Sequence, residues 1–90
     1  MLKIYIAGKI TGNANFEQEF EQAERDLRAQ GHTPLNPAKL PKGLGYGDYI
    51  HIGFAMIDTA EAVMFLDSWR VSRGAKMEFD YALATGKAII

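Results

Sequence analysis

Short apolar segments alternate with longer amphipathic segments along the whole chain. The apolar segments are rich in β-branched and aromatic residues and predict strands near 2–7, 32–37, 62–66 and 87–90. Between them, apolar positions recur every three or four residues and predict helices near 15–30, 49–60 and 72–86. The third apolar segment is uninterrupted, so we expect it to form a central, buried strand.

The helix boundaries carry recognisable signals. Asn15 is suited to cap the first helix, Asp48 the second, and either Ser72 or Arg73 begins the third. The segment 38–47 is rich in Gly and Pro, a composition that predicts a flexible crossover able to act as a lid.

This alternation of strands and helices predicts an α/β fold. Continuous apolar strands joined by helices form parallel sheets that are covered on both faces, so we expect a three-layer sandwich. Right-handed crossovers leave few topologies, and of these we expect a flavodoxin- or Rossmann-like strand order of 2-1-3-4. Ligands bind such sheets where the strand order reverses, at the carboxyl ends of the strands. The loops 8–12 and 67–74 should meet there and form the site.

Composition narrows the class of protein. The 90 residues, 48 % hydrophobic, indicate one globular domain, residues 1–90. The formal net charge of −1 gives no sign of binding to polymeric nucleic acid or to a membrane. The chain contains no cysteine and no signal-peptide pattern, which agrees with a cytoplasmic location. Because so small a core is marginal for a lone domain, we expect a homodimer or a larger homo-oligomer.

The segment Ser72-Arg73-Gly74-Ala75-Lys76-Met77-Glu78 has the most suggestive chemistry. A polar loop that enters a helix offers free N–H groups and a positive dipole end to an anion such as phosphate. Glu78 follows within two turns and is a candidate nucleophile or general base. Taken alone, such a residue is more often a solvated helix acid.

Three stretches of the chain together resemble the nucleoside 2-deoxyribosyltransferase superfamily. They are Ile4-Tyr5-Ile6-Ala7-Gly8-Lys9-Ile10-Thr11-Gly12, then Gly31-His32 with Asn36-Pro37, and then Ser72-Arg73-Gly74-Ala75 with Glu78. The resemblance covers essentially the whole chain. It is strongest to a small uncharacterised branch of the domain-of-unknown-function type, related to the 2'-deoxynucleoside 5'-monophosphate N-glycosidases.

The resemblance implies a reaction at the N-glycosidic bond of a small nucleoside or nucleotide. It implies that Glu78 attacks C1' of a deoxyribose and expels the base, and it adds a hydrogen bond from Tyr5 to the Glu78 carboxylate. Taken by itself, Tyr5 in a buried strand is expected to be a core-packing residue. The superfamily transferases carry an acid at the position of Ser72, whereas the monophosphate hydrolases carry a serine. Ser72 and Arg73 therefore favour a 5'-monophosphate over a free nucleoside. The chemistry needs no metal and no organic cofactor.

The remaining candidates lie in the two loops of the predicted site. We expect substrate contacts from Gly8, Lys9, Ile10, Gly12, Asp67, Trp69, Ser72, Arg73 and Gly74. Several of these have plainer interpretations: the glycines can be turn residues, Asp67 can cap the following turn, and Trp69 can simply pack over its loop.

One position departs from the family pattern. These proteins usually carry an aspartate on the second helix, and the spacing places that position near Gly53. Asp58 lies about 140° further around the helix and is not a simple substitute. Three explanations stay open: the family position lies at another residue, His51 or Asp48 compensates, or the catalytic step is impaired. The alternative function is therefore a catalytically impaired module that binds nucleotides. If the enzyme is merely impaired, Gly53→Asp should raise its turnover.

Overall fold

Four parallel strands form the centre of the computed structural model, which describes residues 1–90. The strands are β1 (Lys3–Ala7), β2 (Thr33–Leu35), β3 (Ala62–Phe65) and β4 (Ala88–Ile89), in the order β2-β1-β3-β4. β1 pairs with both β2 and β3, with Tyr5 opposite Leu35 on one side and Val63 on the other. The predicted strand order is confirmed.

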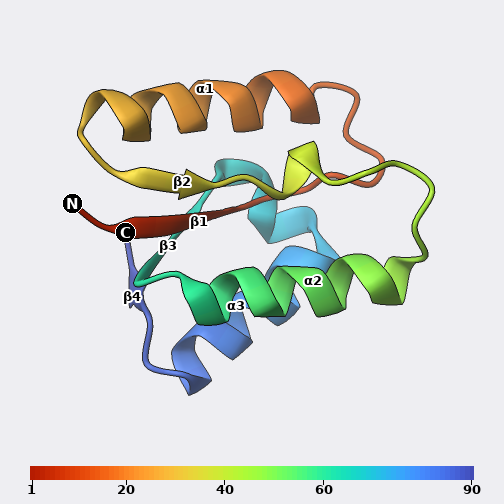
Figure 1. Ribbon diagram of the computed structural model, residues 1–90. Helices are drawn as coiled ribbons and strands as arrows, with labels where there is room; N and C mark the ends of the chain where they lie inside the picture. Colours follow the sequence, from red (N-terminus) through yellow and green to blue (C-terminus); the bar gives the residue numbers. More distant parts are fainter.

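Helices cover both faces of the sheet, as Figure 1 shows. α1 (Phe16–Ala29) lies on one face, and α2 (Tyr46–Thr59) and α3 (Arg73–Ala84) lie on the other. The alternation of side chains along β1 explains the arrangement. Ile4 and Ile6 pack with Phe20 of α1, whereas Tyr5 packs with Ile57 of α2. The three-layer α/β sandwich is therefore confirmed.

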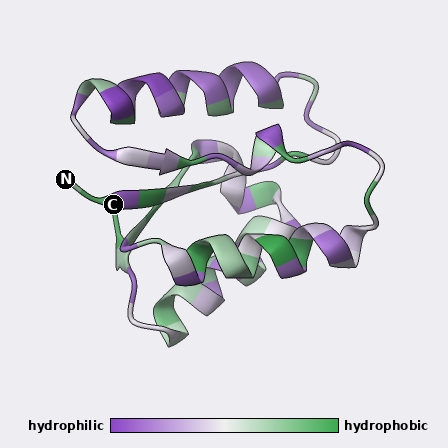
Figure 2. Ribbon diagram, in the orientation of Figure 1, coloured by the Kyte–Doolittle hydropathy of each residue, from purple (hydrophilic) through white to green (hydrophobic).

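Figure 2 shows that the two helical layers differ in hydropathy. α1 is mostly hydrophilic and buries a narrow stripe that includes Phe20, Ala23 and Leu27. α2 is the more apolar helix. No helix of the chain is long and apolar enough to cross a membrane.

The first two connections differ slightly from the prediction. Asn15 does occupy the N-cap position of α1, but its side chain makes no capping hydrogen bond. β2 is shorter than expected because the chain turns into the short 3-10 helix η1 (Pro37–Lys39). The Asn36 side chain initiates that turn by accepting a hydrogen bond from the Ala38 N–H at 2.9 Å.

α2 begins at Tyr46, three residues earlier than predicted, so Asp48 is not its N-cap. Asp48 lies in the first turn instead, and its Oδ2 accepts a hydrogen bond from the Gly45 N–H at 2.9 Å. A carboxylate in this place satisfies a donor at the helix start as well as a preceding cap would. The prediction therefore had the right residue in the wrong role.

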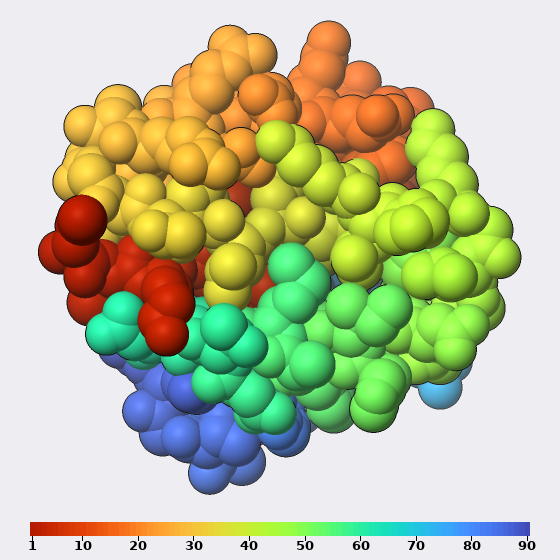
Figure 3. All heavy atoms as spheres, in the orientation of Figure 1, coloured from red at the N-terminus to blue at the C-terminus, as the bar shows by residue number.

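The crossover before α2 is fastened to the helix. The Tyr49 hydroxyl donates to the Pro41 carbonyl at 2.6 Å and accepts from the Leu44 N–H at 3.3 Å. In Figure 3 the segment (yellow-green) lies at the surface beside the start of α1 (orange), where Lys42 approaches Glu17. Tyr49 of α2 thus holds the middle of the predicted lid at two places.

α3 begins as predicted. Ser72 is its N-cap, and the Ser72 Oγ accepts a hydrogen bond from the Ala75 N–H at 3.1 Å. The residues before it form a 3-10 helix, η2 (Asp67–Val71), where the sequence predicted a loop. The Lys9 N–H donates to the Ser68 Oγ at 3.0 Å, so the segments that follow β1 and β3 meet as expected.

Candidate functional site

A cavity of about 650 Å³ opens at the carboxyl ends of β1 and β3. Its walls come from the loop after β1, from η1 and the crossover, from the first two turns of α2, and from the start of α3. It lies where the strand order reverses, between the layers of the sandwich.

Glu78 lies at the floor of this cavity with 7 % of its surface exposed. The Tyr5 hydroxyl, which is also buried, donates to the Glu78 Oε2 at 2.6 Å. Burial raises the pKa of Glu78 to about 7, although the hydrogen bond from Tyr5 lowers it in part. Burial and the adjacent carboxylate raise the pKa of Tyr5 well above its usual value. Glu78 can therefore exchange a proton near neutral pH.

Gly53, in the middle of α2, faces this pair. A Cβ atom at Gly53 would overlap the Glu78 Oε2 and lie 3.1 Å from the Tyr5 hydroxyl oxygen. An aspartate at this position would therefore displace Glu78 from its present place. Glu78 must therefore move before an aspartate fits at Gly53, and the expectation that Gly53→Asp raises turnover stays a prediction.

No nearby side chain replaces an acid at Gly53. Asp48 is engaged at the start of α2, and Asp58 accepts a hydrogen bond from the Tyr81 hydroxyl at 2.6 Å. His51 is exposed, and none of these three side chains lines the cavity. Glu78 is thus the only carboxylate in the cavity wall.

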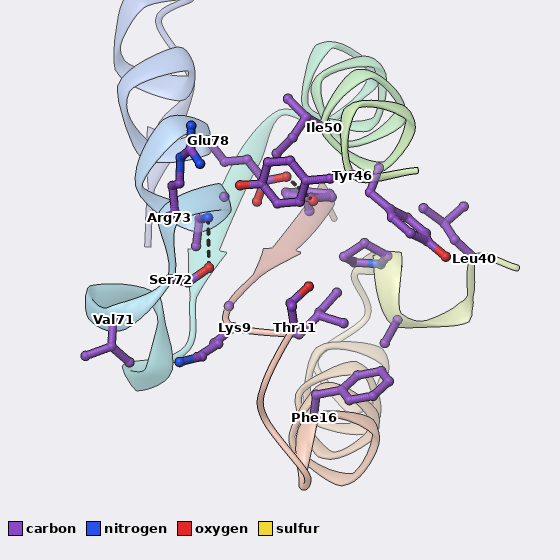
Figure 4. Close-up of a pocket in the computed structure, with 18 of the residues that line it drawn as sticks. Lys9, Thr11, Phe16, Leu40, Tyr46, Ile50, Val71, Ser72, Arg73 and Glu78 are labelled. Carbon is purple, nitrogen blue, oxygen red and sulfur yellow. Dashed lines mark hydrogen bonds between the residues drawn. The ribbon is translucent and has the colours of Figure 1, made fainter. Parts of the chain in front are cut away.

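Cationic and hydrogen-bonding groups line one side of the cavity. Figure 4 shows Lys9, Ser72 and Arg73 along this side. Because the Ser72 Oγ acts as an acceptor in the helix cap, its hydroxyl hydrogen remains available to a ligand. Arg73 and Gly74, the first residues of α3, contribute N–H groups that have no partner within the helix. This side is suited to an anion.

The rest of the cavity wall is largely apolar, and the sequence patterns did not predict it. Its residues are Phe16, Pro37, Leu40, Tyr46, Tyr49 and Ile50. The last three lie on one face of α2 with Gly53, at the spacing i, i+3, i+4 and i+7. This pattern would have revealed the face if the helix had been started at Tyr46.

Tyr46 also connects the two sides of the cavity. Its ring is 5.9 Å from the Arg73 guanidinium carbon, a cation–π contact, and it is 47 % exposed at the mouth of the cavity. An aromatic ring in such a place can stack on a planar ligand.

The structure brings most of the predicted site residues to the cavity wall: Tyr5, Gly8, Lys9, Ile10, Ser72, Arg73, Gly74 and Glu78. Gly8 has a packing role as well. A Cβ at Gly8 would lie 3.1 Å from the Ser68 Oγ and 3.2 Å from Leu66, so glycine allows the two loops to approach. Ile10 likewise packs against the core beneath α1.

Three predicted residues lie outside the cavity wall. Trp69 stacks on Phe79, with ring centroids 4.8 Å apart, and this packing occupies its indole ring. Asp67 is exposed at the start of η2 and makes no capping hydrogen bond. Gly12 has φ +77°, so its glycine is required by the turn before α1. For Trp69 and Gly12, the plainer interpretation fits the structure.

The arrangement combines one buried carboxylate with a separate side that carries cationic side chains and free N–H groups. No group of three or more His, Cys, Asp or Glu side chains is placed to hold a metal ion. Chemically, the cavity offers a carboxylate suited to act as nucleophile or proton acceptor at its floor, donors for a charged group at the start of α3, and apolar surface on much of the remaining wall.

Comparison with known proteins agrees with the fold. A solved structure, the 2-desoxiribosyltransferase from Leishmania mexicana, superposes with a TM-score of 0.76 at 24 % sequence identity. The match covers 98 % of this chain and 61 % of that enzyme, so the chain spans less than two thirds of its length. No curated protein matches the chain.

The family comparison covers nearly the whole chain. The model of a domain of unknown function (DUF4406) matches residues 2–90. The chain therefore belongs to the DUF4406 family and shares its fold with the Leishmania mexicana structure.

Proposed function

We propose that the protein cleaves or transfers at the N-glycosidic bond of 2'-deoxynucleosides or their 5'-monophosphates, with Glu78 as the nucleophile. The observation that carries this proposal is the buried Glu78 carboxylate, hydrogen-bonded to Tyr5 at the floor of a cavity that Lys9 and Arg73 also line. The 2-deoxyribosyltransferase name of the solved structure with the same fold agrees with it.

In the proposed reaction, ionised Glu78 stabilises positive charge that develops at C1' and then bonds to that carbon. The C1'–N bond breaks, its electron pair leaves with the base nitrogen, and solvent supplies the proton that this nitrogen takes up. The deoxyribosyl ester on Glu78 is then attacked at C1' by water or by a second base, which frees the carboxylate. Tyr5 holds the carboxylate in place by its hydrogen bond to Oε2.

The charges around the cavity favour a 5'-monophosphate. Lys9 and Arg73 line the wall without a carboxylate partner, whereas Lys42 is 3.9 Å from Glu17, an exposed pair of little strength. The Ser72 hydroxyl and the first N–H groups of α3 add donors beside Arg73. In this arrangement the phosphate lies at the start of α3, and the sugar lies over Glu78.

The test is incubation with deoxynucleoside 5'-monophosphates and with the matching deoxynucleosides, followed by chromatography for free base. We expect base release by the natural chain, faster with the monophosphates, and its loss in Glu78→Gln. Asp80→Asn, which changes an exposed acid on the same helix, is the matched control and should retain activity. Base release that persists in Glu78→Gln would remove Glu78 from the mechanism.

A nucleotide-binding module without turnover is the second candidate. The observation that favours it is Gly53, which leaves Glu78 as the only carboxylate in the cavity wall. Such a module would bind deoxynucleotides saturably in calorimetry, with no base released over the same period.

A further inference from the structure

Gly53 occupies a position where glycine is costly. It lies inside α2, where glycine is less favourable than alanine because it loses more backbone freedom on folding. Its φ is not in the left-handed region, so the backbone does not require glycine there. The reason must lie in what Gly53 contacts.

The contact is with the Glu78–Tyr5 pair. A Cβ at Gly53 would overlap the Glu78 Oε2, and the Tyr5 hydroxyl oxygen is 3.1 Å from the same point. Gly47, in the first turn of the same helix, is different because nothing lies within 4 Å of its Cβ position. The close approach is therefore specific to Gly53.

The two oxygens of Glu78 are consequently in different environments. Oε2 lies against Gly53 and accepts the Tyr5 hydrogen bond. Oε1 accepts no hydrogen bond from the chain and is not sealed from the cavity, since no fully buried side-chain oxygen lacks a partner. The Glu78 carboxylate is thus held in place at Oε2, whereas Oε1 is open to the cavity.

We propose that Gly53 is a positioning residue: its missing side chain forms a niche that seats the Glu78 Oε2 against Tyr5 and leaves Oε1 as the atom that reacts. This inference rests on the proposed role of Glu78. The niche is filled by the carboxylate itself, so a side chain at Gly53 moves Glu78 out of register with a substrate that is bound at the start of α3.

A thermal-unfolding comparison tests the niche without any need for turnover. Gly47→Ala should raise the melting temperature by about 4 °C, because alanine stabilises an open helix position. Gly53→Ala should lower it. In a Glu78→Ala background, where the carboxylate is gone, most of that loss should disappear. If Gly53→Ala is as harmless as Gly47→Ala, or if its effect is unchanged by Glu78→Ala, the niche is wrong.

Two further measurements separate positioning from a purely structural role. The buried Tyr5 hydroxyl proton should give an NMR signal that is lost in Tyr5→Phe, retained in Gly47→Ala, and shifted or lost in Gly53→Ala. With a deoxynucleotide that the natural chain turns over, Gly53→Ala should lower kcat by about 100-fold. KM should change little, because binding at the start of α3 is intact. A rise in KM with kcat unchanged would contradict positioning.

These experiments distinguish the niche from the proposed function. If no deoxynucleotide releases its base, the proposed function fails. The unfolding and NMR comparisons still show whether Gly53 seats the Glu78 carboxylate. If base is released and Gly53→Ala behaves like Gly47→Ala in every measurement, the niche fails and the proposed function stands.

Discussion

Glu78 is a carboxylic acid whose ionised form is disfavoured by its surroundings. Only 7 % of the residue is exposed, and its one hydrogen bond comes from Tyr5. Burial of this kind costs folding free energy, and such costs are concentrated at sites of chemistry. Two predictions at the scale of single residues follow from the raised pKa.

Glu78→Gln should stabilise the fold at high pH. Because the folded pKa is raised from 4.5 to about 7, the proton on Glu78 contributes stability below pH 4.5, and this contribution is lost as the pH rises through 7. The full loss is on the order of 3 kcal/mol. We therefore expect Glu78→Gln to melt above the natural chain at pH 8 and close to it at pH 4.5, measured by circular dichroism. An offset that does not change with pH would contradict this prediction, and Asp80→Asn is the control.

Tyr5→Phe should move the activity to higher pH. If Glu78 must be ionised to attack, base release should rise through pH 7 in the natural chain. The Tyr5 hydrogen bond lowers the pKa of Glu78, so removing the hydroxyl raises that pKa and displaces the rise in rate toward alkaline pH. Tyr81→Phe, which removes an exposed hydroxyl bonded to Asp58, should leave the profile in place. If the rise in the rate of base release moved to lower pH in Tyr5→Phe, this role for Tyr5 would be ruled out.

At the scale of elements, Ser72 at the start of α3 combines an observed structural task with the binding task that we propose for it. The Ser72 Oγ caps the helix, and the same residue lines the cavity beside Arg73. The two tasks can be separated by charge, because aspartate caps a helix as well as serine does but repels an anion.

We predict that Ser72→Asp keeps the fold and loses the preference for phosphate. Calorimetry should show at least a tenfold weaker affinity for a deoxynucleoside 5'-monophosphate, about 1.4 kcal/mol, and no comparable change for the deoxynucleoside. Ser72→Ala is the complementary variant, since it should cost about 1 kcal/mol of stability through the lost cap. Equal weakening of both ligands by Ser72→Asp would place the phosphate elsewhere.

The elements also show what sequence could predict. Strand and helix alternation, and the Ser72 start of α3, follow from local patterns of burial and capping. The start of α2 was missed because Gly45 and Gly47 normally interrupt helices, whereas here Asp48 stabilises the first turn from inside. That error of three residues hid the apolar wall that begins at Tyr46.

At the scale of the whole molecule, the meeting of loops at the carboxyl ends of β1 and β3 was predictable from the strand and helix alternation, the handedness of the crossovers and the expected strand order. The niche at Gly53 was not, because it depends on how closely α2 passes Tyr5 and Glu78 in the assembled sandwich. These residues are separated by long stretches of sequence, and no local pattern encodes their distance. A glycine at an interior helix position was the one available signal.

The packing of Trp69 gives the chain an optical probe of its own. Trp69 is the only tryptophan, it stacks on Phe79 beside Glu78, and its carbonyl accepts a hydrogen bond from the Ser72 N–H at 3.1 Å. Trp69 therefore contacts both the N-cap of α3, at Ser72, and its second turn, at Phe79, although it does not line the cavity. Its intrinsic fluorescence can report on occupancy at the start of α3 without a label and without direct contact with the ligand.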